Sequence, residues 1–413
     1  MNILFLYEYR KQSANYNIAL KLINEFEKNG VSIFSRYYYN EKTVSSESKD
    51  DEIWNHTVNS PYTQYYYNIK NNKSWNNNCF WRKLLFFVSH PRFASSFIVF
   101  KFDHLTNCYF GRRRIKQFCL NNKIDCIIGI SAPHEIEKIM SNFNICIPVL
   151  LLRLDPYAFN PCYPDSEKNK RLKEERIILS RVNRLFSTNL IIRDLLNDRS
   201  LNCFFNKMVA IEFPMISETD PIRSNNNTEY HFFQKKEETT YLLHAGTFYN
   251  DIRPPQKLVS FMKELPEKYI LLVAGINSAD IRKYDEEIRD RIIDLGCLSS
   301  DEINSVIEDC DFLISYNNLN TNMVPSKLFE CIDSGKPFIN LCHSDKCPTI
   351  NYVKDYDMAF TVVLDKQFNR DELISFLENT KGCKSSREQI LNRYEKCTVK
   401  YVAGQIIDEF KSV

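Results

Sequence analysis

The stretch DFLISYNNLNTNMVPSKLFECIDSGKPFINL, which runs from Asp311 to Leu341, decides the fold. It begins and ends with short apolar runs, DFLISY and KPFINL, that are typical of buried strands. Between them, Pro325 has the fixed φ that suits the first turn of a helix, and Gly335 suits the turn that ends one. The stretch therefore predicts a strand, a helix and a second strand, which is one unit of a parallel α/β sheet.

The same alternation extends outward in both directions. In the first half of the chain the predicted strands are NILFLYE, VSIF, IDCIIGI, IPVLLLR, RLFST and KMVAIEF, with helices over residues 15–30 and around Glu135, Glu174 and Arg193. In the second half they are TYLLHAG, YILLVAG, IIDLG, DFLISY, KPFINL and MAFTVVL, with helices over residues 255–265, 279–291, 299–309, 326–334 and 370–380. Parallel strands joined by helices predict an α/β protein with two Rossmann-like, doubly wound domains.

Length and composition fit two domains. A chain of 413 residues is too long for one ordinary core, and 44% apolar residues supply material for two. We expect an N-terminal domain over residues 1–213, a polar linker over 214–239 and a C-terminal domain over 240–385. Residues 386–413 have helical spacing, as one long helix or two shorter ones, and we expect this segment to return to the first domain.

Charge and cysteine content exclude several classes of protein. The formal net charge is only +2, so nothing in the overall balance indicates a nucleic-acid-binding protein. The 14 cysteines include no C-x-x-C pair and no regular spacing, and we read them as reduced and cytosolic. Cys342, His343 and Cys347 lie near one another in sequence, but without a second ligand pair they do not predict a metal site.

The predicted helix over residues 326–334 carries the first candidate site. Its exposed backbone N–H groups and partial positive charge suit the oxygens of a diphosphate, and Lys327 adds a full charge in the first turn. Glu330 lies one turn further along, placed to accept hydrogen bonds from ribose hydroxyls. Spacing alone leaves open that Lys327 and Glu330 are an ordinary solvent-exposed pair.

The string PSKLFECIDSGKPFI resembles the signature of the retaining GT-B glycosyltransferases of family 4 type, which include phosphatidylinositol mannosyltransferases and lipopolysaccharide and capsule glycosyltransferases. The resemblance covers Tyr241 to Leu341 well and the first domain loosely. It implies two Rossmann-like domains that face each other across a cleft, the first for the acceptor and the second for a nucleotide sugar, most often a UDP- or GDP-sugar. It also implies transfer with retention, no settled protein nucleophile, and no metal or other cofactor.

The resemblance also assigns site residues. Glu330 matches the second of two family glutamates eight residues apart, whereas Asn322 stands at the first. Gly246 matches a family glycine, Thr247 replaces the arginine that follows it, and Arg253 occupies the position of a lysine on the diphosphate. Gly275, Ile276 and Leu298 follow predicted strands of the second domain, and we expect the nucleotide base there because ligands of open α/β sheets bind at the carboxyl ends of strands. Together the predicted donor-binding residues are Gly246, Thr247, Gly275, Ile276, Leu298, Asn322, Val324, Pro325, Ser326 and Glu330, with Arg253 and Lys327 as catalytic cations. A surface arginine that caps a loop is the alternative for Arg253.

Two further catalytic candidates belong to the first domain. His134 in SAPHEI stands at a strand-to-helix junction, where a donor or acceptor hydroxyl can arrive. Asp155 in LLRLDPYAFNP resembles the acidic Asp-Pro segment that faces the cleft in the family. A histidine that begins a helix is as often a capping or packing residue, and that alternative stays open.

The acceptor side is indicated by FWRKLLFFVSHPRFASSFIVFKF, residues 80–102, which combines aromatic residues with flanking Arg and Lys. This mixture is typical of a segment that lies on an anionic membrane surface. We therefore expect a cytoplasmic enzyme, peripheral on the inner face of the cell membrane, with a lipid-linked or saccharide acceptor from surface polysaccharide synthesis. The alternative is that the aromatic residues fill the core of the first domain.

Two rival functions share the same scaffold. A nucleotide-sugar epimerase also has two Rossmann-like domains, but it does not depend on an acceptor. A non-catalytic nucleotide-binding subunit is suggested by Thr247 and Asn322, which replace charged residues of the family. Such a protein binds the donor and never cleaves it.

Overall fold

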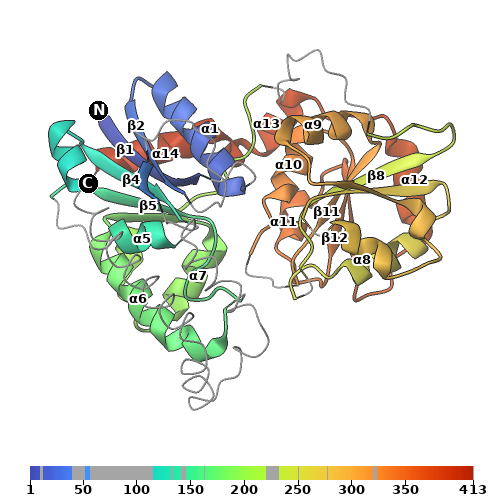
Figure 1. Cartoon of the computed structure of the whole chain (residues 1–413), viewed down its shortest axis with the longest axis horizontal. Helices are drawn as coiled ribbons and strands as arrows, with labels where there is room; N and C mark the ends of the chain where they lie inside the picture. Colours follow the sequence, from blue (N-terminus) through green and yellow to red (C-terminus); the bar gives the residue numbers. More distant parts are fainter. Residues whose placement is uncertain are drawn as a thin grey trace, which may run out of the picture.

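The computed structural model describes residues 1–9, 13–39, 52–55, 115–131, 134–140, 146–161, 163–219, 232–249, 251–276, 278–319 and 323–412. Within these ranges the strands form two sheets, both wholly parallel (Figure 1). The membrane segment predicted at residues 80–102 and the predicted donor residue Asn322 lie outside the described residues.

The first sheet has seven strands in the order β3-β2-β1-β4-β5-β6-β7. Its strands are β1 (Asn2–Tyr9), β2 (Ser32–Tyr39), β3 (Glu52–Asn55), β4 (Cys126–Ile130), β5 (Val149–Arg153), β6 (Arg184–Ser187) and β7 (Met208–Ala210). The connecting helices are α1 (Ala14–Lys28), α5 (Glu135–Met140), α6 (Lys168–Arg181) and α7 (Asn189–Asn197), with 3-10 turns η2 (Asp165–Glu167) and η3 (Asn202–Lys207).

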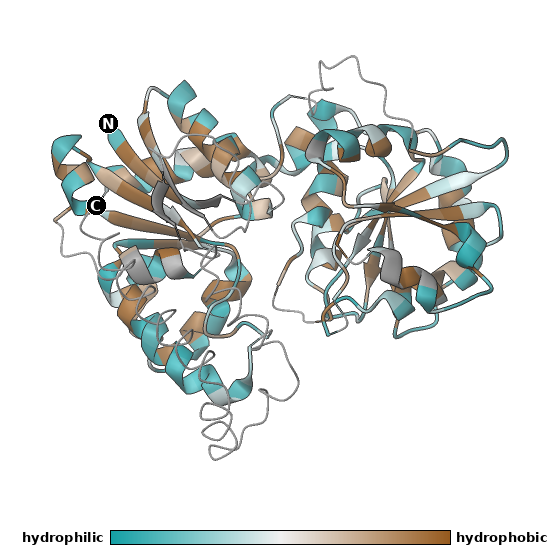
Figure 2. Ribbon diagram, viewed as in Figure 1, coloured by the Kyte–Doolittle hydropathy of each residue, from teal (hydrophilic) through white to brown (hydrophobic). Residues whose placement is uncertain are grey.

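Burial on both faces explains why the strands of this sheet are almost continuously apolar. In β1, Ile3 and Phe5 pack with α1, whereas Leu4 and Leu6 pack with α5, α6 and α7 on the opposite face. Figure 2 shows the hydrophobic strands at the centre of each domain, with polar residues on the outer sides of the helices.

The second sheet has six strands in the order β10-β9-β8-β11-β12-β13. They are β8 (Thr240–Ala245), β9 (Tyr269–Ala274), β10 (Ile292–Gly296), β11 (Phe312–Tyr316), β12 (Phe338–Cys342) and β13 (Ala359–Val363). The helices are α8 (Pro255–Lys263), α9 (Ser300–Asp309), α10 (Lys327–Ser334), α11 (Thr349–Val353) and α12 (Arg370–Thr380). The prediction of an α/β protein with two doubly wound sheets is confirmed.

One predicted helix is wrong. Residues 279–291 form two separate 3-10 turns, η4 (Ser278–Lys283) and η5 (Arg289–Arg291), in place of a continuous helix. The carboxylate of Asp285 accepts the backbone N–H of Glu287 at 2.9 Å, and it also pairs with Lys263. Such a local hydrogen bond from backbone to side chain competes with the hydrogen bonds of a helix. It accompanies the break between the two turns.

The chain crosses between the two sheets twice, and the two crossings run side by side. The backbone N–H groups of Met215 and Ile216 both donate to the carbonyl of Cys397 at 3.1 Å, and Val399 donates back to Ile216 at 3.2 Å. The end of the chain then forms α13 (Arg387–Arg393), the turn η6 (Glu395–Cys397) and α14 (Val399–Lys411). Helix α14 packs beside α1 on the first sheet (Figure 1).

A polar cluster holds this junction together. Lys21 of α1 donates to the carbonyl of Met215 at 2.6 Å and to the hydroxyl of Ser217 at 3.2 Å. Asp333 of α10 accepts the backbone N–H of Ser217 at 3.0 Å and pairs with Arg387 of α13. This cluster therefore connects α1 of the first domain and α10 of the second domain to the two crossing segments.

Among the described residues, no helix combines the length and the apolar character that crossing a bilayer requires.

We predict that Gly335→Ala lowers the free energy of unfolding by about 1 to 3 kcal/mol. Gly335 ends α10 at φ +71°, and a Cβ there would lie 2.9 Å from the carbonyl oxygen of Ser385. The matched control is Gly404→Ala within α14, where a Cβ meets open space and helix propensity should add about 0.5 to 1 kcal/mol. Urea unfolding measures both; equal effects would show that the left-handed conformation at Gly335 is not a constraint.

Candidate active site

The predicted donor residues follow the strands of the second sheet at one edge. Because its strands are parallel, their carboxyl ends meet there, and ligands of such sheets bind beyond those ends. Gly246 and Thr247 follow β8, Gly275 and Ile276 follow β9, and Leu298 follows β10. The central pair of strands, β8 and β11, leads into helices that pack on opposite faces of the sheet.

The loops after β8 and β9 touch through two glycines. The backbone N–H of Gly246 donates to the carbonyl of Ala274 at 2.8 Å. Gly275 has φ +140°, and a Cβ on it would lie 2.4 Å from the carbonyl oxygen of Gly246. Only glycine fits this position, because a side chain there would be both strained and in collision with backbone. The structure thus brings the predicted residues of these two loops together.

Arg253 returns to the end of β8. Its terminal nitrogen Nη1 is 3.4 Å from the position that a Cβ on Gly246 would take. The loop that carries it is held by the backbone bond from Arg253 to Tyr249 at 2.7 Å and by the bond from Leu319 to Ile252 at 2.8 Å. The loops after β8 and β11 are therefore fastened together, with the guanidinium over the glycine.

Helix α10 begins at the same edge. Val324 and Pro325 are buried just before it, and among the described residues no side chain caps its first turn. Lys327 forms an ion pair with Glu330, and both side chains remain about one-third exposed. Pro325 stands two residues before the first helical residue, slightly earlier than the sequence predicted.

His244 reports on the charge at this edge. It is 1% exposed, with Nδ1 3.3 Å from the carbonyl oxygen of Ile314. Burial, and then the positive charges of Arg253 and Lys327, lower the pKa of His244 to about 3. Both predicted cations therefore add to the effect of burial at the end of β8 and disfavour a second positive charge there.

Sequence reasoning missed the buried polar atoms around this point. Nε2 of His244 and Oδ1 of both Asn317 and Asn318 are buried without a hydrogen-bond partner within the described ranges. All three are potential acceptors for the hydroxyl groups of a ligand. The signal was available, since polar residues at the ends of strands that are otherwise apolar face the edge where ligands bind.

His134 and Asp155 lie at the matching edge of the first sheet. His134 directly precedes α5, with Nδ1 3.2 Å from the hydroxyl of Ser131 and 3.5 Å from Oε1 of Glu137. Its ring is 4.5 Å from that of Tyr157. Burial raises the pKa of Asp155, while the nearby His134 and a hydrogen bond with Asn15 of α1 act against this rise.

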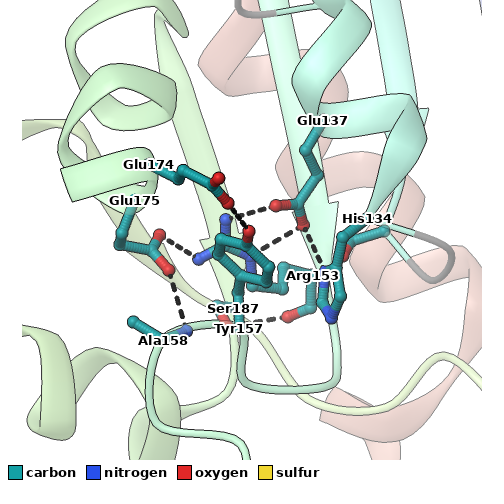
Figure 3. Close-up of polar contacts among 9 residues, drawn as sticks. His134, Glu137, Arg153, Tyr157, Ala158, Glu174, Glu175 and Ser187 are labelled. Carbon is teal, nitrogen blue, oxygen red and sulfur yellow. Dashed lines mark hydrogen bonds and ion pairs between the residues drawn. The ribbon is translucent and has the colours of Figure 1, made fainter. Parts of the chain in front are cut away.

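A buried ion cluster supports these two residues, and the sequence did not predict it (Figure 3). Arg153, the last residue of β5, donates to Glu137 from Nε at 2.9 Å and from Nη2 at 2.7 Å. Its Nη1 pairs with Glu175 of α6, and all three side chains are fully buried. Burial acts to raise the pKa of Glu137, but the Arg153 charge holds it well below the usual range. Burial raises the pKa of Glu175.

Comparison with known proteins establishes the fold. No protein-family model matches the sequence, and no curated protein matches it. The structure is similar to that of a glycosyltransferase from Rickettsia africae, with a TM-score of 0.58 and 11% sequence identity. The match covers 100% of this chain and 98% of the other. Anabaena HepE, solved with UDP and glucose, matches over the whole of both chains at TM-score 0.56 and 11% identity. The chain has the GT-B fold.

The same architecture serves another kind of enzyme. The UDP-GlcNAc 2-epimerase of Neisseria meningitidis, bound to UDP-GlcNAc, matches over the whole of both chains at TM-score 0.51 and 12% identity. The GT-B fold therefore leaves both a transferase and an epimerase open.

The four catalytic candidates of this chain lie in two domains. Arg253 and Lys327 belong to the domain of the second sheet, and His134 and Asp155 belong to the domain of the first.

We predict that acid destabilises the protein partly through His244. Between pH 6.5 and about 3 the unfolded His244 binds a proton and the folded one does not, so stability falls as the pH is lowered through this window. His244→Phe should reduce the slope of unfolding free energy against pH there by up to about 1.4 kcal/mol per pH unit. Urea unfolding at pH 7, 6, 5 and 4 measures it. An unchanged slope would mean that His244 becomes protonated in the folded protein.

Proposed function

We propose that this protein is a retaining glycosyltransferase that moves a sugar from a nucleotide-sugar donor to a lipid-linked or saccharide acceptor. The observation that carries the proposal is that Arg253 lies beside Gly246 at the end of β8, while Lys327 stands in the first turn of α10, which no side chain of the described residues caps. Backbone N–H groups at a helix N-terminus together with two cations suit a diphosphate. The GT-B fold, which occurs in a protein solved with UDP and glucose, supports the same reading.

The proposed mechanism relies on charge at the departing diphosphate. As the sugar leaves with oxocarbenium-like character, negative charge grows on the phosphate oxygens, and Arg253 and Lys327 stabilise it. Glu330 accepts hydrogen bonds from the ribose, which requires that its ion pair with Lys327 open when the donor binds. The acceptor oxygen attacks from the face that the diphosphate leaves and forms the new glycosidic bond, while the hydroxyl proton passes to the departing diphosphate. The proposed reaction uses no protein nucleophile and no metal ion.

The first sheet supplies the acceptor side. We place the reacting hydroxyls against His134 and Asp155, which lie close together at the carboxyl ends of β4 and β5. The uncharged acceptor atoms of Asn317 and Asn318 receive hydroxyl groups of the donor sugar. In the sequence, both precede Asn322, which stands where the family has its first glutamate.

A donor screen tests the function. A ligand that binds only the folded protein raises its melting temperature, so UDP-, GDP-, ADP- and CMP-sugars are compared first by thermal shift. The stabilising donor is then incubated with candidate acceptors. Transfer that requires an acceptor separates a transferase from an epimerase, which alters the sugar without one. Binding without any turnover would identify a non-catalytic subunit and overturn the proposal.

We predict that Arg253→Ala and Lys327→Ala slow transfer about a hundred- to thousand-fold, a cost of about 2.7 to 4 kcal/mol, and weaken donor binding far less. Glu330→Ala is the contrasting variant. It should weaken nucleotide binding by about 1.5 to 3 kcal/mol, because a ribose loses a charged acceptor. Rapid-quench kinetics and calorimetry measure the two effects, and activity should survive EDTA. Rescue of an EDTA-treated enzyme by magnesium or manganese would overturn the metal-free mechanism.

We propose further that the protein works in the cytoplasm, peripheral on the inner face of the cell membrane. Residues 79–124 carry nine Lys or Arg against one acidic residue, Asp103, among several aromatic residues. We predict that neutralising Arg82, Lys83, Arg112, Arg113 and Arg114 together reduces binding to anionic vesicles, at about 1 kcal/mol per charge. Sedimentation with phosphatidylserine vesicles at low salt measures it. A wild-type protein that stays in the supernatant would contradict the membrane proposal.

A further inference from the structure

We propose that Arg153 is the positioning residue that sets the spacing of His134 and Asp155, and that it holds each of them through its own glutamate. Glu137 forms the arm to His134, and Glu175 forms the arm to the loop that carries Asp155. The inference rests on the proposed function, in which His134 and Asp155 meet the reacting hydroxyls. It adds three residues that the family resemblance did not assign.

Burial shows that Arg153 acts through other residues. The side chains of Arg153, Glu137 and Glu175 have no exposed surface, so none of them can touch a substrate. His134 keeps about a tenth of its side chain exposed, and it is the member of the chain of contacts that reaches the edge of the sheet. Any influence of the buried cluster on a reaction must therefore pass through its neighbours.

The first arm fixes the orientation of the His134 ring. Two donors of Arg153 hold both carboxylate oxygens of Glu137, which leaves that carboxylate no freedom to turn. Nδ1 of His134 lies 3.2 Å from the hydroxyl of Ser131 and 3.5 Å from Oε1 of Glu137. The hydroxyl can donate or accept, whereas an ionised carboxylate can only accept, so we assign the ring hydrogen to Nδ1. The contact with Glu137 directs Nε2 away from the buried cluster. This is the arrangement in which an acidic residue orients a reactive histidine.

The second arm fixes the loop after β5. Glu175 receives Nη1 of Arg153 on one oxygen and the backbone N–H of Ala158, at 3.3 Å, on the other. Ala158 lies three residues after Asp155, and the segment between them contains Pro156, which restricts the backbone further. The neighbouring Glu174 holds the hydroxyl of Tyr157, whose ring packs against His134. The two arms meet at that ring contact (Figure 3).

The guanidinium group suits this task and an ammonium group does not. Arginine presents its N–H groups in one rigid plane, so a single side chain fixes two carboxylates in defined directions. The backbone of Arg153 is itself held, because the hydroxyl of Ser187 in β6 donates to its carbonyl at 2.7 Å. A cluster with no catalytic purpose could be replaced by apolar side chains without loss, since buried ion pairs are weak contributors to stability.

The experiment uses double-mutant cycles on the full-length protein. Turnover is followed as release of UDP from UDP-glucose or of GDP from GDP-mannose. Glu137→Gln should lower kcat about ten- to hundredfold with little change in KM, the range found when an orienting partner is lost. In a His134→Ala background, the same substitution should change kcat less than twofold. If Glu137 acts only through His134, its substitution cannot lower kcat further once His134 has been removed.

The second arm supplies the matched comparison. Glu175→Gln should lower kcat in the wild-type background and change it less than twofold in an Asp155→Asn background. In the His134→Ala background it should still lower kcat by most of its wild-type effect. Arg153→Lys should combine both losses. Glu286→Gln, an exposed residue of the second domain, is the neutral control for the change from carboxylate to amide. Melting temperatures are measured for every variant, since losses of kcat that follow the melting temperature, or equal losses with and without His134, would overturn the proposal.

A spectroscopic measurement separates this inference from the proposed function. With 15N-labelled histidine, His134→Asn assigns the signals of the His134 ring, and the wild type should show hydrogen on Nδ1. Glu137→Gln should shift those signals, and Glu286→Gln should not. If the wild type turns over no nucleotide sugar, the proposed function fails and these spectra decide the positioning alone. Unchanged His134 signals in Glu137→Gln would overturn it.

Discussion

The second sheet depends on one constraint, which is that β8 and β11 are neighbours whose following helices pack on opposite faces. No helix can then cover the carboxyl ends of both strands. The loop after β8 turns back so that Arg253 lies over Gly246, and the loop after β11 leads to the exposed start of α10. The positive groups at this edge follow from strand order, because chain order alone separates Arg253 and Lys327 by more than 70 residues.

Much of this arrangement could be predicted from sequence. Buried parallel strands are apolar on both faces and short, so twelve strands of the two sheets were visible as apolar runs, and Gly335 marked the end of α10. The helix expected over residues 279–291 was wrong, and the structure has two 3-10 turns there with a side-chain hydrogen bond of Asp285 between them. Such local bonds compete with helix formation, and hydrophobic periodicity does not reveal them. The predicted roles of the site residues remain predictions, although their positions at the edges of the sheets agree with ligand binding.

The Arg153 cluster shows what sequence could not supply. The string LLRLDP presents Arg153 as a charged residue beside Asp155, and nothing local distinguishes an exposed arginine from a buried one. Its burial depends on Glu137 and Glu175, 16 and 22 residues away, which reach it from two different helices. Glu174 and Glu175 are adjacent residues of the same type in α6, yet only Glu175 is buried and pairs with the guanidinium of Arg153. Three-dimensional packing alone assigns these roles.

The two sheets treat positive charge in opposite ways. In the first, one guanidinium faces two carboxylates inside the core, so its charge is fully compensated and serves geometry. In the second, burial and then the positive charges of Arg253 and Lys327 lower the pKa of His244, although Glu330 pairs with Lys327. A positive charge at the edge of a sheet attracts ligands of opposite charge, whereas a charge paired inside the core attracts none. This distribution of charge agrees with the proposal that the second sheet binds the diphosphate and that the first sheet orients the groups that meet hydroxyls.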